Sequence, residues 1–537
     1  MHRALEILEV VEMICEQIIW AGRWSPSDSP RDLAVLARTC TVFCNPALNI
    51  LWRHQGTIMN LLKCMPDDLW KIEVHSNGHI DIRLQRAIIQ TDWERPRFYL
   101  FRVRSFSNIF ENLRSTDFLE TLSFCLPREC VFPNLEKLAW CSPSPASAPF
   151  PHVRLFLTPR IKNLVLGTIE TISHLSILSN LVTKCPVLTT VTIWTNGFLD
   201  LEATPVISNF VCALTHVKSL DVPWLNPAAF THLAQLPDVE SLSFRRILHQ
   251  PSRSLFPSPS TINFPSFRAL QELKFISADL KIVGGLLTLA SNCPLVRVEI
   301  SNAGEPTKDT VGEFYVTVAN HCSHAVLRRI YIGGDKKNQI AATAEQIDTY
   351  AVGLHELKPL FSFDNLVSVC LTHPVGFDLD DVAVLAMASA WPRIQDLVLV
   401  TSLTRHLDSR VTLEGLCAFA KYCPRLHTLE ITFDATHIPE NLYQGQTRVA
   451  QDSLMSLNVG SSAINEPRRV AKFLSAIFPK LQWITTLYED LVEPVEEEEE
   501  VEEVIVVPAI SASHGFWKEV DQAIYESLIP RDGLVSE

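Results

Sequence analysis

The densest group of metal-binding side chains in the chain is HCSH, which holds His321, Cys322 and His324. Imidazole and thiolate groups bind zinc, but a zinc site takes four ligands that usually come from two separated pairs. The sequence has no second cluster at that spacing and no Cys-x-x-Cys pair. We therefore predict no metal, with Cys322 packed at the start of a structural repeat and the two histidines facing water.

Motifs for nucleotide or acyl chemistry are also absent from the sequence. It contains no phosphate loop, dinucleotide-binding fingerprint, nucleophile elbow or His-Glu-x-x-His motif. The segment YIGGDKK, residues 331–337, could suggest phosphate contact, but a solvated turn is the favoured interpretation. A loop or hairpin is expected at HSNGH, residues 75–79. The sequence therefore predicts a protein that is not an enzyme and has no cofactor.

The charge balance limits the kinds of partner that the chain is expected to bind. Lysine and arginine number 46 against 60 acidic residues, so the net charge is −14. A negative chain is poorly suited to a phosphate backbone, and we expect no nucleic-acid partner. Four glutamates interrupt the N-terminal apolar segment, and no segment is long and apolar enough for a membrane span. The 14 cysteines are scattered along the chain, and we interpret them as reduced thiols. Because thiols stay reduced in the cytosol and nucleus, we expect a soluble protein in the cytoplasm, the nucleus or both.

A repeated sequence pattern, here called the repeated phrase, predicts the secondary structure that would position any binding residue. Apolar residues recur at positions x, x+3 and x+5, mostly at intervals of about 25 to 32 residues, near the period of leucine-rich repeats. A proline often stands two residues before x, where a strand would begin. The starts are Leu119, Leu135, Ile161, Leu188, Val217, Val239, Leu270, Leu295, Leu327, Leu366, Ile394, Leu426 and Leu454, with a weaker one at Leu481.

Each repeat is expected to be a strand followed by a helix. In residues 378–391 we expect Val382, Leu385, Ala386 and Ser389 to form the buried stripe. Because one unit cannot cover both of its apolar faces, neighbouring units must stack. The predicted fold class is α/β, a leucine-rich-repeat solenoid with a curved parallel sheet over residues 116–490. Unrelated α/β crossovers are the alternative, but the fixed offset is not expected of them.

Residues 1–55 do not show the repeated phrase and read as three short helices. The first spans about Leu5 to Trp20, the second begins at Ser29 and Pro30, and the third begins at Asn45 and Pro46. A module this small usually docks on something else. Residues 56–115 are expected to form a helical linker and N-terminal cap.

The C-terminal part begins with an acidic run, residues 493–504, in an expected flexible linker over 491–510. The alternative interpretation is that this acidic run attracts a basic partner electrostatically. Residues 511–537 are expected to hold a helix with Phe516, Trp517, Val520, Ile524 and Leu528 at helical spacing. We favour a cap on the last repeat over a partner-binding helix.

The N-terminal helices resemble an F-box. The run LEILEVVEMICEQI is followed by RDLAVLARTCTVFCNPALNILWR, in which VLARTC, Phe43 and Trp52 match the later half of that family's pattern. Leu8 stands where the family usually has proline, and AGRWSPSDSP lengthens the first loop. With the repeats that follow, and with residues 51–70 between them, the chain resembles the F-box proteins with leucine-rich repeats of mushroom-forming (basidiomycete) fungi.

This resemblance implies a substrate-recognition subunit of an SCF-type cullin-RING ubiquitin ligase. Its module would bind a Skp-type adaptor and its repeats would bind a protein substrate. The alternative is a stand-alone repeat scaffold without a ligase. The adaptor-binding residues would be Leu5, Ile7, Leu8, Val11, Ile14, Leu33, Leu36, Cys40 and Trp52.

Substrate selection would rest on the side chains between the apolar positions, which project from the open face of the sheet. They form a varied set with the residue types common at binding hot spots, although ordinary solvation of a sheet face is the alternative for any single one. The candidates are Trp194, Asp221, Arg245, Lys274, Arg297, Glu299, Arg329 and Tyr331.

Overall fold

The computed structural model describes residues 7–21, 29–74, 80–109, 117–126, 129–141, 150–245, 266–291, 293–334, 344–401, 409–439, 450–486 and 508–528. The chain divides into two compact units, Met1–Asp238 (unit 1) and Val239–Glu537 (unit 2). The predicted hairpin at 75–79, the two lysines of YIGGDKK and most of the acidic linker lie outside the described residues. The predicted domain boundaries at 55, 115, 490 and 510 stay predictions.

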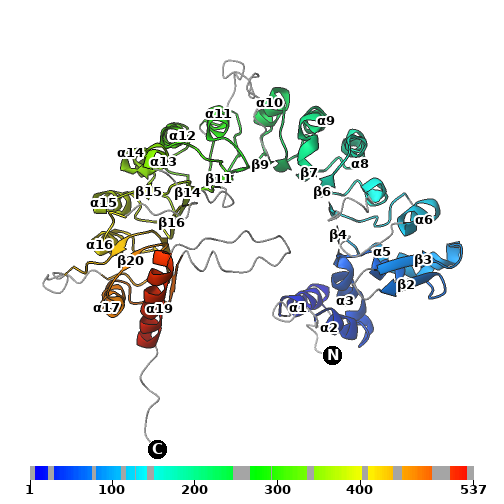
Figure 1. Ribbon diagram of the computed structural model, residues 1–537. Helices are drawn as coiled ribbons and strands as arrows, with labels where there is room; N and C mark the ends of the chain where they lie inside the picture. Colours follow the sequence, from blue (N-terminus) through cyan, green and yellow to red (C-terminus); the bar gives the residue numbers. More distant parts are fainter. Residues whose placement is uncertain are drawn as a thin grey trace, which may run out of the picture. The chain divides into compact units, whose positions relative to one another are not determined.

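Unit 1 begins with three helices and continues into strand–helix repeats (Figure 1). Its parallel strands follow the order β1-β4-β5-β6-β7-β8, and β2 and β3 form a separate antiparallel hairpin. The helices are α1 (Leu8–Ala21), α2 (Ser29–Leu36), α3 (Thr41–Arg53), α4 (Met59–Leu62), α5 (Glu94–Leu100), α6 (Asp117–Cys125), α7 (Ile172–Leu175), α8 (Leu178–Lys184), α9 (Asp200–Cys212) and α10 (Pro227–Gln235). The strands are β1 (His54–Gln55), β2 (Trp70–Val74), β3 (Ile80–Leu84), β4 (Ser105–Ile109), β5 (Lys137–Cys141), β6 (Asn163–Ile169), β7 (Thr190–Thr195) and β8 (Ser219–Val222).

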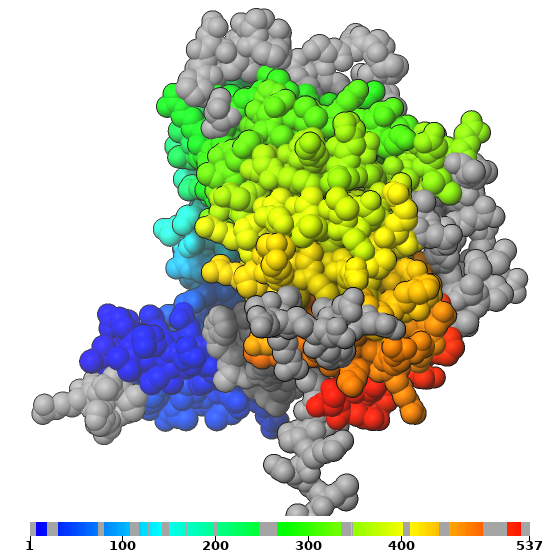
Figure 2. All heavy atoms as spheres, turned by 90° about the vertical axis from the view of Figure 1, so that its left-hand side faces the viewer, coloured from blue at the N-terminus to red at the C-terminus, as the bar shows by residue number. Residues whose placement is uncertain are grey.

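Unit 2 repeats the same alternation, with its strands on the inner side and its helices on the outer side (Figure 1). Figure 2 shows its successive repeats as stacked bands from green to orange. The helices are α11 (Leu280–Leu289), α12 (Lys308–His321), α13 (Ala344–Tyr350), α14 (Leu354–Leu357), α15 (Asp381–Ala390), α16 (Leu413–Tyr422), α17 (Pro467–Ile477) and α19 (Pro508–Leu528). The parallel strands, in sheet order, are β9 (Ser241–Arg245), β10 (Glu272–Ile276), β11 (Arg297–Ser301), β12 (Arg329–Ile332), β14 (Ser368–His373), β16 (Asp396–Thr401), β17 (Thr428–Glu430), β19 (Ser456–Asn458) and β21 (Trp483–Thr485). Two short ladders, β13 (Val352–Gly353) with β15 (Phe377–Asp378) and β18 (Asp434–Ala435) with β20 (Ala463–Ile464), run beside it.

The register of the strands confirms the predicted fold class of strand–helix leucine-rich repeats. Residues at x+3 lie side by side along the sheet of each unit, and all of them are at most 3% exposed. Stacking them removes both flanks of every repeat from water, at about 1.5 to 3 kcal/mol for each fully buried large side chain. In unit 2 the row is Leu242, Leu273, Val298, Ile330, Val369, Leu397, Leu429, Leu457 and Ile484.

Where a proline precedes a repeat strand, it lies in a tight turn, as three examples show. The amide of Leu135 donates to the carbonyl of Phe132, and the same bond joins Leu426 to Cys423 and Leu481 to Phe478. The intervening proline is then the second residue of the turn, where its fixed φ is favoured and its missing N–H is not needed. The repeated phrase therefore encodes the turn as well as the strand.

Two details of the repeat prediction are wrong. The match at Leu119 lies in α6, and Phe124 at its x+5 position is 81% exposed. In α15 the buried residues are Ala383, Val384, Met387 and Ala388, whereas Val382 and Leu385 are exposed. The reason is that Asp381 accepts hydrogen bonds from the amide (2.8 Å) and the hydroxyl (2.7 Å) of Thr412, which fixes the rotation of the helix.

The three N-terminal helices are present, but the third begins earlier than predicted. α3 starts at Thr41 after the extended residue Cys40, so Pro46 lies inside the helix. Phe43 is the reason, because it packs against the core of the module and extends the helix backwards. Proline at this depth removes one backbone hydrogen bond, which packing here offsets.

The C-terminal helix α19 caps the last repeat, as predicted. Trp517, Val520 and Ile524 are at most 2% exposed and pack with α17 and β21. The indole of Trp517 donates to the carbonyl of Ser462 (2.9 Å), and Asp521 accepts from the amide of Ile484 in β21 (2.8 Å). The helix therefore covers the apolar end of the stack and satisfies a donor of the edge strand.

Candidate interaction surfaces

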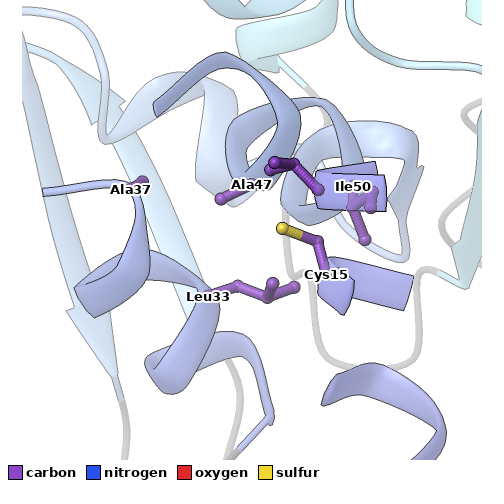
Figure 3. Packing of buried hydrophobic residues seen from close by; sticks show 6 residues of the cluster. Cys15, Leu33, Ala37, Ala47 and Ile50 are labelled. Carbon is purple, nitrogen blue, oxygen red and sulfur yellow. The ribbon is translucent and has the colours of Figure 1, made fainter. Parts of the chain in front are cut away.

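The helical module of α1–α3 has a small core of its own. Val11, Cys15, Leu33 and Ala47 are fully buried, and Ile50 lies beside them (Figure 3). Leu36 packs partly buried against this cluster. Of the predicted adaptor-binding residues, Val11 and Leu33 therefore hold the helices together in this structure, and Leu36 lies at the edge of the core.

Other predicted adaptor-binding residues of the module are open to solvent. Ile7 is 50% exposed, Leu8 56% and Ile14 37%, all at the start or along one side of α1. Cys40 is half-buried, and Leu5 lies outside the described residues. Val35 on α2 and Val42 on α3 are also exposed but are absent from the predicted set. Each fits the helical apolar pattern, which gives no sign of its exposure.

The module is tied to the first strands of the repeat sheet. α3 runs directly into β1, which pairs with β4. Trp52 stacks on Tyr99 with the ring centroids 4.6 Å apart, so its half-buried ring contacts α5. Arg102, which follows α5, donates to the side chain of Asn45 (2.9 Å) and to the side chain of Asn49. These contacts fix the orientation of the module within unit 1.

The open face of the unit 1 sheet carries one of the predicted aromatic anchors. Trp194 is 37% exposed on β7, and its indole nitrogen lies 3.4 Å from Oδ2 of Asp221 on β8. An aromatic ring held by a neighbouring carboxylate is oriented before any partner arrives, which limits the entropy lost on binding.

In unit 2 the predicted residues of β10 and β11 form one ion-pair group. Glu299 is only 8% exposed. One of its carboxylate oxygens lies 2.6 Å from Nζ of Lys274, and the other lies 2.6 Å from Nη2 of Arg297. Both cations remain about two-fifths exposed. The buried carboxylate therefore orders two cationic side chains whose outer surfaces face solvent.

On β12, Arg329 and Tyr331 continue the same face. Arg329 is opposite Arg297 in the register, and Tyr331 is opposite Glu299. Both are exposed, Tyr331 by 38%. Burial, with smaller contributions from Cys370 and Glu299, raises the pKa of the Tyr331 hydroxyl, so it stays a neutral hydrogen-bond donor. Arg245, at the end of β9, is half-buried and lies at a different level of the sheet.

Trp483 is an exposed aromatic residue of the same face and is absent from the predicted set. It is 58% exposed at the x+2 position of the last repeat and lies opposite Ser456. Its position in the repeated phrase was available as a signal, but the phrase at Leu481 is the weakest of the set.

The residues considered for chemistry behave as structural groups. In the part of the chain that the structure describes, no three His, Cys, Asp or Glu residues could hold a metal ion. Cys322 is buried, which raises its pKa to about 12, and His324 is exposed. His321 differs from the prediction in being half-buried, with Nδ1 2.6 Å from the hydroxyl of Ser291. Burial also raises the pKa of Cys423 to about 12, so these thiols lack nucleophilic activation.

Among the helices of the described residues, none combines the length and the apolar character needed to cross a bilayer.

Comparisons with known proteins add little information about this chain. No protein-family model and no curated protein matches the chain. Among solved structures, a chain from the crystal structure of the Rad7 and Elc1 complex in yeast is similar, with 14% identity and a TM-score of 0.18. That similarity covers 67% of this chain and 85% of the other. Functional conclusions therefore depend on the residues described above.

Proposed function

We propose that this protein is the substrate-recognition subunit of an SCF-type cullin-RING ubiquitin ligase. The α1–α3 module binds a Skp-type adaptor, and the open face of the repeat sheet binds a protein substrate. The repeat scaffold is of a kind that is typically non-catalytic, so the contribution to the reaction is proximity between substrate and ligase.

The observation that supports adaptor binding best is the exposure of aliphatic side chains on α1. Ile7 and Leu8 are each at least half exposed although the module has an apolar core into which such residues could pack. Ile7 directly precedes α1 and is seven residues from Ile14, so the two lie toward the same side of the helix. Exposed aliphatic groups gathered on a small helical module indicate a docking surface.

A second observation supports a receptor with fixed geometry. Because α3 continues into β1 and Trp52 stacks on Tyr99, the module and the first repeats of unit 1 are held together without a flexible linker. A partner held by the module is therefore presented at a defined orientation to this sheet, which raises the effective concentration of the joined groups.

We predict that replacing Ile7 and Leu8 by aspartate strongly weakens adaptor binding. Two carboxylates in the docking surface would be desolvated without a partner, and we expect at least an about tenfold loss of retained adaptor. The module itself should stay folded, because both side chains are exposed and acidic residues favour the start of a helix. The measurement is a pull-down of purified Skp-type adaptor on the full-length chain.

The matched control is the double replacement of Val382 and Leu385 by aspartate on α15. These residues are 67% and 46% exposed and also lie near the start of a helix. This control should retain the adaptor as the unchanged protein does. If the unchanged protein retains no adaptor, the stand-alone scaffold is the better description; if both double variants lose it equally, the assignment to α1 is wrong.

A further inference from the structure

We propose that the open face of β10–β12 binds an acidic, extended segment of a partner protein, with Arg329 and Arg297 as its ion-pair donors. The inference rests on the proposed receptor function only in identifying that partner as the substrate. The anionic groups recognised are carboxylates or phosphates, which present the same paired oxygens to arginine.

The three strands place six side chains on a small grid. One row is Glu272, Arg297 and Arg329, and the next is Lys274, Glu299 and Tyr331. Neighbouring strands are about 4.8 Å apart, so groups on adjacent strands can contact one ligand. The grid therefore presents three cations and a phenol within the reach of a short peptide.

Glu299 fixes the grid before a ligand arrives. It is nearly buried and bonds Lys274 and Arg297 at the same time, at 2.6 Å each. The two cations lose rotamer freedom in folding, so a ligand that approaches their exposed sides loses less entropy on binding. A buried carboxylate with two cationic partners also leaves the local group with a positive charge.

Arg329 is the cation of this grid whose side chain is available to a ligand. It is exposed, and within the described ranges its side chain forms no ion pair or hydrogen bond. It lies opposite Arg297, and like charges on neighbouring strands are destabilising. Two adjacent arginines sharing no further carboxylate are expected where an anion from outside completes the arrangement.

The sheet surface beside Arg329 carries side chains that suit an extended peptide ligand. The ring of Tyr331 lies over Gly333, where an added Cβ would meet the phenol oxygen at 2.9 Å. On the next strand, β14, the facing positions hold the small residues Ser368 and Cys370. The exposed tyrosine therefore lies beside small residues, and its hydroxyl is a hydrogen-bond donor that an extended peptide over these strands could reach.

The surrounding charges favour a peptide over a nucleic acid. Glu272 is opposite Arg297, and Asp396 on β16 lies on the far side of Ser368. These carboxylates would repel a continuous phosphate backbone that extended past the three strands. An acidic peptide can place its charges over the cations and uncharged residues elsewhere, and the cationic group stands out in a chain of net charge −14.

The test is fluorescence anisotropy of labelled hexaglutamate with the full-length protein at low salt. We expect that salt weakens the binding. Arg329→Glu should increase Kd about tenfold, or about 1.4 kcal/mol, because it removes a charge-assisted hydrogen-bond donor and adds a carboxylate that repels the peptide. Arg468→Glu, an exposed arginine on α17, makes the same change in net charge and should raise Kd less than about twofold. Arg329→Gln should give an intermediate loss, and thermal unfolding checks that each variant is folded.

Other probes decide the kind of ligand. A hexapeptide of alternating serine and phosphoserine should compete with hexaglutamate for the same surface. Equal binding of labelled hexaglutamine, tighter binding of hexadeoxythymidine, or an equal effect of Arg468→Glu overturns the inference. Adaptor pull-down on the same variants separates the two proposals: Arg329→Glu should retain the adaptor, and an absence of peptide binding with adaptor retained defeats only the acidic-ligand inference.

Discussion

Replacing Trp517 by alanine is expected to lower the free energy of unfolding of unit 2 by about 3 to 5 kcal/mol, the range for truncating a buried tryptophan. The indole is 1% exposed, packs against Phe433 and donates to the carbonyl of Ser462. Its loss opens a cavity under α19 and leaves that carbonyl without its donor. Because each repeat is stabilised by its neighbours, the last repeats should unfold first.

The measurement is hydrogen exchange of the amides in α17, β19 and β21, together with urea unfolding of the full-length chain. Phe516→Ala provides the matched control, because that neighbouring aromatic side chain is 40% exposed and should change stability by much less. Equal effects of the two substitutions would mean that α19 does not act as a cap.

The fold could be predicted because its main determinant is local and repeated. The offsets x, x+3 and x+5, with proline at the turn, specify a turn and a strand within nine residues, and neighbouring copies then align in register. The match at Leu119 fails for the same reason: three apolar residues at these offsets also occur in a helix, and Leu119 and Leu122 are buried there as helical residues. The missing proline does not by itself distinguish it, because true repeats such as those that start at Val217 and Leu327 also lack a proline there.

Features that depend on distant residues could not be predicted. The apolar residues of α15 fit two stripes at helical spacing, one with Val382 and Leu385 and one with Val384 and Met387. The hydrogen bonds of Asp381 to Thr412, about one repeat away, accompany burial of the second stripe. Likewise, the role of Trp52 depends on Tyr99, which no local pattern connects to it.

The candidate surfaces, too, could be predicted only in part from the sequence. Period-two alternation is enough to place Lys274, Glu299 and Tyr331 on the open face. It does not show that Glu299 is nearly buried between two cations whereas Arg329 is exposed, because that difference depends on the lengths and contacts of side chains on neighbouring strands. On the module, the resemblance to an F-box selects Val11 and Leu33 together with Ile7 and Leu8, although only the latter pair is exposed.

A buried histidine makes unit 2 sensitive to acid. His373 on β14 is fully buried, and its Nε2 lies 2.9 Å from the hydroxyl of Tyr315 on α12. Burial raises the pKa of that tyrosine, so the hydroxyl stays protonated and can donate to the neutral imidazole. Burial lowers the pKa of His373 from 6.5 to about 3, because an imidazolium ion would be desolvated there.

We therefore predict that acid destabilises unit 2 through His373. Between pH 6.5 and about 3 the unfolded chain binds a proton that the folded chain does not. The free energy of unfolding is therefore highest, as far as His373 is concerned, above pH 6.5. It falls as the pH falls, by at most about 1.4 kcal/mol per pH unit for one proton. His373→Gln should reduce this slope between pH 6 and 4, as measured by urea unfolding at each pH.

Two further variants separate titration from packing. Tyr315→Phe removes the hydrogen bond but keeps the buried imidazole, so it should lower stability at pH 7 while the acid slope remains. His437→Gln replaces an exposed histidine of the same unit and should leave the slope unchanged. An unaltered slope in His373→Gln would show that His373 is protonated in the folded protein near its ordinary pKa, which is incompatible with a dry core at the junction of α12 and β14.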